Sequence, residues 1–198
     1  MTPPAPFVGL AGEPLTDQVS RLLAGAVPEG PLAIVQAGHP ALRAVAAPYA
    51  GELPADLLAA LLAAMRRTML AAPGVGLAAP QVGLSVAVAV VEDMWPLDPE
   101  TAAERERTPV PFRVLVNPDY RPVGAFRVKH PEGCLSVRGW QAGRERWRRI
   151  HLTGLDETGA ALDEELVGWP ARIVQHETDH LRGELYVDGA DLRTLAIG

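Results

Sequence analysis

Residues 175–181 read QHETDHL and contain the pattern H-E-x-x-H, around which the rest of the chain must be organised. On a helix, this spacing places His176 and His180 one turn apart on the same face. Two imidazoles so placed can bind one metal ion, with Glu177 beside them to move protons at a bound water. The pattern therefore predicts a helix that carries part of a metal site, and the remaining sequence must supply a third ligand and a pocket.

The ends of this helix are also visible in the sequence. Pro170 suits the first helical turn, and Gly183 suits the stop after the second histidine. Ile173 lies three residues before His176 and seven before His180, so all three share one face. We therefore expect the histidines to point inward together with an apolar neighbour.

Length and charge indicate an ordinary globular chain. It has 198 residues, 48% of them hydrophobic and 21% charged, and a formal net charge of −6. This acidic balance argues against a nucleic-acid partner, because phosphate binding needs a basic surface. We interpret the local basic run at residues 144–149 (RERWRR) as a solvated strand face. We expect one catalytic domain over residues 31–198, after a proline- and glycine-rich N-terminal extension over residues 1–30.

The cysteine content and the N-terminus bear on the compartment. Cys134 is the only cysteine, so no disulfide can form within the chain. The first residues lack the basic and apolar regions of a signal peptide. No apolar run approaches the roughly 20 residues that span a bilayer. We expect a cytoplasmic protein with no membrane partner.

Periodicity predicts the secondary structure. Over residues 54–71, Leu57, Leu61, Met65 and Met69 recur every four residues, which indicates an amphipathic helix in the N-terminal half of the chain. β-branched residues predict strands over residues 85–92, 112–117, 123–129, 144–152, 160–166 and 184–187.

The connections between these strands decide the fold class. Most of them are short, which favours antiparallel pairing. Residues 93–111 are instead charged and rich in proline, and are expected to form an exposed loop. The predicted class is α+β, with antiparallel β-sheets packed around the central H-E-x-x-H helix and the amphipathic helix beside them.

The third metal ligand discriminates among hydrolases that share H-E-x-x-H. In the metzincin pattern a third histidine follows the second, but Tyr186 occupies that position here. The residues after His180 leave little room for a glutamate ligand on a later helix. Upstream, residues 132–136 (EGCLS) contain Cys134. A lone cysteine is commonly a small buried hydrophobe, whereas a thiolate here would complete a Cys-His-His site. The residues alone leave both interpretations open.

Residues 74–83 (GVGLAAPQVG) form the other unusual stretch. Its glycines let the backbone approach a ligand closely, and the Gly-Lys-Ser/Thr ending of a phosphate loop is absent. Gln81 is the only polar side chain in this loop. Its amide could point into a site, but the spacing alone favours a turn with a surface glutamine.

Taken together, residues 74–81, 132–136 and 175–181 resemble the three signature motifs of the peptide deformylase family, in the same order and at similar separations. The similarity runs from about residue 34 to residue 187 and includes residues 154–156 (GLD) and 168–172 (GWPAR). The clearest departure is Arg138, at a position where proline commonly follows Cys-Leu-Ser-Val. This difference bears on the strand geometry beside the expected ligand.

The resemblance implies a metal-dependent hydrolase that removes the formyl group from formyl-methionyl nascent polypeptides and releases formate. It implies three ligands to one divalent metal: Cys134, His176 and His180. The metal is typically Fe²⁺ in this family, with Zn²⁺, Ni²⁺ or Co²⁺ as alternatives, since thiolate and imidazole bind all of them. Metal-bound hydroxide would attack the formyl carbon, with Glu177 as general base and then acid. The Gln81 amide and the Leu135 backbone N–H would stabilise the oxyanion.

The resemblance also implies how the substrate is held. Gly76 would hydrogen-bond the peptide backbone, and Arg172 would direct its guanidinium outward along its stem. The implied substrate-binding set comprises Val75, Gly76, Glu132, Gly133, Trp169, Arg172 and Ile173. The expected partners are nascent peptides at the ribosome exit in a bacterial cytoplasm, and the expected state is a monomer or weak dimer.

Two other functions stay open at this point. One is a related metal hydrolase that acts on another small N-acyl group or on a peptide bond. The other is a non-catalytic metal-dependent binding domain, against which Gln81 and Glu177 argue because binding alone does not require them. No role is assigned to residues 1–30 or 93–111.

Overall fold

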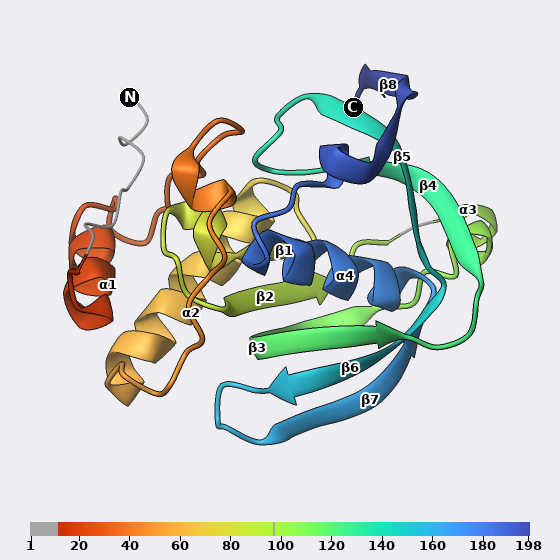
Figure 1. Cartoon of the computed structure of the whole chain (residues 1–198). Helices are drawn as coiled ribbons and strands as arrows, with labels where there is room; N and C mark the ends of the chain where they lie inside the picture. Colours follow the sequence, from red (N-terminus) through yellow and green to blue (C-terminus); the bar gives the residue numbers. More distant parts are fainter. Residues whose placement is uncertain (1–11, 97) are drawn as a thin grey trace.

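The computed structural model describes residues 12–96 and 98–198. Helix α4 (Trp169–Leu181) crosses the molecule, with a five-stranded sheet on one side and a three-stranded sheet on the other (Figure 1). The larger sheet has the order β1-β2-β3-β6-β7, the smaller β4-β5-β8, and every pair of neighbours is antiparallel. The predicted α+β class is confirmed.

The bounds of the remaining elements follow. The helices are α1 (Leu15–Ala24), α2 (Ala55–Ala71) and α3 (Pro99–Glu104), with 3-10 turns η1 (Pro40–Leu42), η2 (Ala79–Val82) and η3 (Tyr186–Gly189). The strands are β1 (Gly76–Ala78), β2 (Val88–Asp93), β3 (Val110–Pro122), β4 (Arg127–Gly133), β5 (Trp140–Trp147), β6 (Arg149–Leu155), β7 (Ala161–Val167) and β8 (Ala190–Ile197). Among the described residues, no helix is long and apolar enough to cross a bilayer.

The amphipathic helix predicted over residues 54–71 is α2. Its apolar face buries Leu61, Met65 and Met69 completely against strands β1 and β2. Truncating one such side chain to alanine costs about 2–5 kcal/mol in other proteins. Helix α1 packs on α2 and adds Val19 and Leu22 to the same core, so the described part of the expected N-terminal extension is tied to the domain. Residues 1–11 lie outside the described residues.

Four local predictions of secondary structure were wrong. The single strand expected over residues 144–152 is divided between β5, which ends at Trp147 in the smaller sheet, and β6, which begins at Arg149 in the larger sheet. The strand expected over residues 184–187 does not form, and the chain there enters the turn η3 instead. The Asp188 carboxylate accepts the Leu185 N–H at 2.8 Å and so stabilises the turn. The last strand, β8, follows that turn. The expected loop at residues 93–111 contains helix α3, which Asp98 caps by accepting the Thr101 N–H.

The fourth error concerns β3, which runs past the expected break at residue 117. Asn117 adopts a left-handed conformation (φ 50°), and its amide bonds both the N–H and the C=O of Tyr49 at 2.8 Å. These bonds hold a bulge inside a continuous strand, and the register of β3 with β6 shifts at this point.

Helix α4 is buried on most of its circumference. Ala171, Ile173, Val174 and Leu181 pack into an apolar cluster with the larger sheet. The same helix also buries several charged and polar side chains. Burying a charge is costly unless it is paired, so the partners of these groups define the site.

Candidate metal centre and active site

Three side chains with metal-ligand chemistry converge at the middle of α4. The ligand atoms of Cys134, His176 and His180 all lie within 4.8 Å of one another, with Cys134 Sγ 3.2 Å from His180 Nε2. The two imidazole rings meet edge-on, 4.9 Å between centroids. A thiol and two imidazoles at this separation fit a single divalent cation with an open position.

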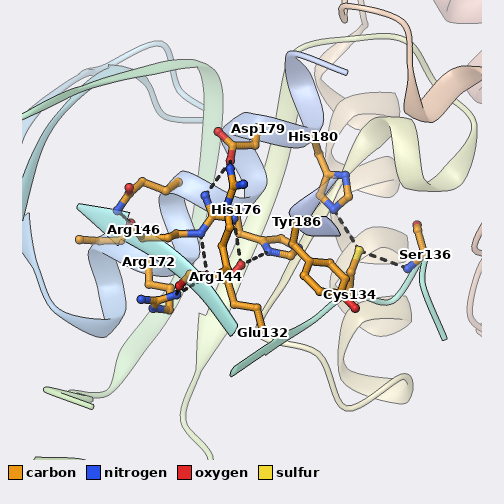
Figure 2. Close-up of polar contacts among 12 residues, drawn as sticks. Glu132, Cys134, Ser136, Arg144, Arg146, Arg172, His176, Asp179, His180 and Tyr186 are labelled. Carbon is orange, nitrogen blue, oxygen red and sulfur yellow. Dashed lines mark hydrogen bonds and ion pairs between the residues drawn. The ribbon is translucent and has the colours of Figure 1, made fainter. Parts of the chain in front are cut away.

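The surroundings of His176 favour a cation beside the thiol. His176 Nδ1 lies 3.2 Å from a Glu132 carboxylate oxygen, a contact that orients the ring and directs Nε2 toward Cys134 (Figure 2). Burial by itself lowers the pKa of His176, but contacts with Cys134 and Glu132 outweigh it and raise the pKa to about 10. At His180, burial and the neighbouring positive charges lower the pKa and favour the neutral imidazole that binds metals.

Glu132 belongs to a buried charge network that extends behind α4. Arg146 donates two hydrogen bonds to its carboxylate (2.7 and 2.9 Å) and a third to Asp179 at 2.6 Å. Tyr120 donates its hydroxyl to the other Asp179 oxygen at 3.0 Å. Burial by itself raises the pKa of Glu132, but His176 and Arg146 outweigh it and hold the pKa below its usual range. The network thus keeps a full negative charge behind His176.

Arg172 was expected to point outward, and that prediction was wrong. Its side chain is only 6% exposed, and its guanidinium donates to Glu132 and to the carbonyl oxygens of Val128 (2.6 Å) and Arg144 (3.1 Å). A buried carboxylate that also faces His176 attracts this second cation inward. The basic run at residues 144–149 is likewise not one solvated face, since Arg146 is buried.

Glu177 lies beside the three donor atoms without a hydrogen-bond partner for its Oε2 among the described residues. Burial raises the pKa of this carboxyl to about 7, although His176 and Arg146 oppose the shift. A pKa near neutrality suits a group that accepts and returns a proton. A Cβ atom on Gly76 would lie 2.1 Å from Glu177 Oε1, so only glycine leaves room for this carboxylate.

Gln81 is 1% exposed, and its interpretation as a surface glutamine was therefore wrong. Its Oε1 accepts the Ala78 N–H at 2.8 Å, which fixes which end of the amide faces the site. The Nε2 donates to Ser136 Oγ at 3.3 Å and approaches Cys134 Sγ at 3.7 Å. The turn η2 thus presents an N–H donor beside the thiol.

A cavity of about 390 Å³ opens onto this centre. Of the residues singled out in the sequence, all but His180 line it: Val75, Gly76, Gln81, Glu132, Gly133, Cys134, Leu135, Trp169, Arg172, Ile173, His176 and Glu177. His180 is buried behind them. The structure therefore brings the expected ligand, catalytic and substrate-binding residues to one place.

Two positioning contacts were missed in the sequence. Gln36 donates its amide to the Leu135 carbonyl at 3.0 Å and accepts the Arg138 N–H at 3.3 Å, which steadies the segment that carries Cys134. A proline in place of Arg138 has no N–H and could not make that bond. Nothing in the sequence links Gln36 to residues about 100 positions away.

The second missed contact holds Trp169 at the cavity wall. Its indole N–H donates to the buried Asp93 carboxylate at 2.6 Å, and Arg107 donates two bonds to the same carboxylate (2.7 and 2.6 Å). The segment at residues 93–111 therefore supports the start of α4. The charged character of that segment was visible in the sequence, but its partner was not.

This H-E-x-x-H helix lies between antiparallel sheets, with a thiol beside its imidazoles and a buried glutamate whose Oε2 has no hydrogen-bond partner in the described part of the chain. Such an arrangement is the architecture of a metal-dependent hydrolase. Comparison with known proteins identifies the family within this class of hydrolases. The family model for polypeptide deformylase matches residues 31–195. Peptide deformylase 3 of Streptomyces avermitilis is 59% identical over 186 residues, which cover 94% of this chain and 82% of that protein.

More distant relatives agree with this result. The human mitochondrial peptide deformylase is 39% identical over 180 residues, which cover 88% of this chain and 74% of that protein. A Met-Ala-Ser-bound class I type b peptide deformylase from Acinetobacter baumannii has a TM-score of 0.73 at 35% identity, and the match covers 82% of this chain and 99% of that one. The chain belongs to the polypeptide deformylase family, as its three motifs predicted.

Proposed function

We propose that this protein is a metal-dependent deformylase that removes the N-terminal formyl group from formyl-methionyl peptides and releases formate. Membership of the polypeptide deformylase family supports the reaction class. The observation that carries the proposal is the convergence of three metal-donor atoms with Glu177 and Gln81 at one cavity.

Cys134, His176 and His180 would hold the metal ion. We propose Fe²⁺ as the physiological ion, with Zn²⁺, Ni²⁺ and Co²⁺ as possible replacements at the same donors. When bound, the ion supplies Lewis acidity, which lowers the pKa of water and polarises a carbonyl oxygen. Glu132 keeps His176 oriented toward the ion through its 3.2 Å contact.

The protein's own residues would handle the proton and the developing charge. Glu177 takes a proton as the oxygen of water adds to the formyl carbon, and its raised pKa suits the later return of that proton to the leaving nitrogen. The C–N bond then breaks to give formate and a free N-terminal amine. The Gln81 side-chain N–H and the Leu135 backbone N–H would stabilise the tetrahedral oxyanion.

The cavity wall supports a preference for methionine. Val75, Trp169 and Ile173 give it apolar surface. Glu132 and Arg172 also line the cavity, but they are paired with each other, and Glu132 is paired with Arg146 as well, so the charges of these two residues are compensated where they face an uncharged thioether. Gly76 and Gly133 would bind the peptide backbone in a strand-like manner.

We also propose the setting in which the enzyme acts. Its substrates would be nascent peptides at the ribosome exit in a bacterial cytoplasm, and the protein would work as a monomer or weak dimer. Residues 31–198 would form the catalytic domain, with residues 1–30 as an extension. The Met-Ala-Ser complex of the A. baumannii relative supports a methionine peptide as the ligand.

One experiment tests the activity. Anaerobically purified protein, analysed for metal on the same sample, is incubated with formyl-Met-Ala-Ser and formate is measured. We expect one divalent metal per chain and formate release, with no turnover of acetyl-Met-Ala-Ser or unblocked Met-Ala-Ser. Turnover of the acetylated or unblocked peptide without formate release by the Fe²⁺-loaded protein would favour a different metal hydrolase.

A further inference from the structure

Arg105 differs from Arg172, the other arginine that lines the cavity at the metal centre. Arg172 is paired with Glu132 and donates to two carbonyl oxygens (Figure 2). Within the part of the chain that the structure describes, Arg105 forms no ion pair and its side chain makes no hydrogen bond. It is half-buried. Its guanidinium therefore keeps its hydrogen-bond donors for a ligand in the cavity.

The backbone at Arg105 is held against the start of α4. Arg105 directly follows helix α3. The next residue, Glu106, accepts the Trp169 N–H at 3.3 Å through its carbonyl oxygen and binds Arg148 through its carboxylate. A Cβ atom on Gly168 would lie 2.5 Å from Glu106 Cβ, so this turn packs closely on the beginning of the helix. These contacts fix the place from which the Arg105 side chain starts.

This place lies beside the part of the cavity walled by Val75, Trp169 and Ile173, here called the methionine slot. Burial lowers the pKa of Arg172, and the nearby charge of Arg105 acts in the same direction. Successive side chains of an extended peptide point to opposite faces. If the first side chain enters the slot on the α4 side, the second points away from α4. Arg105 is therefore nearer to the first side chain than to the second.

A hydrogen-bond donor at an otherwise apolar slot discriminates among side chains of similar size. The thioether sulfur of methionine is only a weak acceptor. Oxidation of that sulfur gives methionine sulfoxide, which has nearly the same length and carries a strongly polar oxygen. An anionic side chain would also meet the ionised Glu132 carboxylate in the same wall. A neutral acceptor is therefore the group that suits Arg105 best.

We propose that Arg105 is a specificity-determining residue, whose guanidinium donates to the sulfoxide oxygen of peptides that begin with formyl-methionine sulfoxide. The enzyme would then deformylate such peptides as well as unoxidised ones. This inference rests on the proposed function, because it concerns the same cavity and the same reaction. The formyl carbon is unchanged by oxidation at the far end of the side chain, so the chemistry at the metal centre stays the same.

The test compares two substrates that differ by one oxygen atom. With full-length, metal-loaded protein, kcat/KM for formate release is measured for formyl-Met-Ala-Ser and for its sulfoxide. The parent should process the sulfoxide with a kcat/KM within about tenfold of that for the thioether, because the charge-assisted hydrogen bond offsets desolvation of the sulfoxide. In Arg105→Met the ratio of sulfoxide to thioether kcat/KM should fall at least about tenfold further. Arg105→Lys keeps a cationic donor and should lower the ratio less.

The matched control is Arg121→Met. Arg121 is an exposed arginine on β3, outside the cavity, and like Arg105 it forms no ion pair within the described residues. Its replacement removes the same charge and should leave the ratio as in the parent. An equal fall in this control would overturn the proposal, because it would indicate only the overall charge of the protein. Thermal melts confirm that each variant is folded.

A binding measurement separates this proposal from the proposed function. Met-Ala-Ser and its sulfoxide are titrated into the same proteins by calorimetry, and the preference for the sulfoxide should fall at least about tenfold in Arg105→Met. Absence of formate release from both substrates would overturn the proposed function, and the binding preference would then decide the role of Arg105. A ratio or preference that Arg105→Met leaves unchanged would overturn the role of Arg105 alone. So would a parent enzyme that processes the thioether but not the sulfoxide, or a protein that neither binds nor processes either peptide.

Discussion

Replacing Gly76 with alanine should disable the enzyme through Glu177. The added Cβ would lie 2.1 Å from Glu177 Oε1 and 2.5 Å from its Cδ, whereas ordinary contact begins at 3.4 Å. The carboxylate is 3% exposed and enclosed by α4 and β1, so it must shift by about 1 Å. A displacement of this size costs about 100-fold in rate, or about 2.7 kcal/mol in the activation free energy.

The assay is formate release from formyl-Met-Ala-Ser, with kcat and KM determined separately. We expect kcat to fall about 100-fold with little change in KM, because the Gly76 backbone that would bind the peptide is retained. Metal content should stay the same, since none of the three donors moves. The matched control is Gly25→Ala at the end of α1, where the nearest atom to the new Cβ is 3.4 Å away. That variant should keep full activity.

A double-mutant cycle isolates the cause. If the clash acts through the Glu177 carboxylate, Gly76→Ala should have almost no further effect on the residual rate of Glu177→Ala. A second 100-fold loss in that background would show that alanine acts through something else. Gly76→Ala with the parent kcat would refute the close approach itself.

Three further predictions concern the same centre. Glu177→Gln should lower kcat by about 10²–10⁴-fold with metal content unchanged, and retention of activity would exclude this residue as the proton carrier. Arg146→Met removes a cationic partner from two buried carboxylates, so it should lower the free energy of unfolding in urea by about 3–5 kcal/mol. The control Arg149→Met changes an exposed ion pair and should lower it by less than about 1 kcal/mol. Equal losses in the two variants would contradict the buried network. Peroxide should inactivate the Fe²⁺ form with oxidation of Cys134 visible by mass spectrometry, and equal sensitivity of the Zn²⁺ form would argue against a redox-active ion at the thiolate.

Local patterns in the sequence were enough for the main helices and for the fold class. Helix α2 was predicted from apolar residues every four positions, and α4 from its proline start, its glycine stop and H-E-x-x-H. These signals depend on residues that lie within a few helical turns of one another, so they can be recognised without knowing any distant partner. The final turn and strand were misjudged because the Asp188 contact that closes η3 is a side-chain bond that periodicity does not report.

The candidate site was likewise predicted from the sequence in part, and the rest of it required the tertiary structure. In the sequence, H-E-x-x-H indicated His176, His180 and Glu177, and the resemblance of the three motifs to the deformylase family added Cys134 and Gln81. Only the tertiary structure showed that Gln81 is buried with its N–H toward the thiol, and that Gly76 is a glycine because Glu177 needs the space.

What the sequence by itself determined is the set of reactive groups and the helix that carries two of the metal donors. What only the tertiary structure decided is how their charges are balanced. Arg146 joins Glu132, 14 residues away, to Asp179, 33 residues away. Arg172 turns inward and donates to the Glu132 carboxylate. In the linear chain, Arg146 and Asp179 read as ordinary surface charges, and nothing shows that Glu132 and Arg172 pair with each other. Their roles follow from low-dielectric burial, which makes a distant opposite charge the strongest available partner.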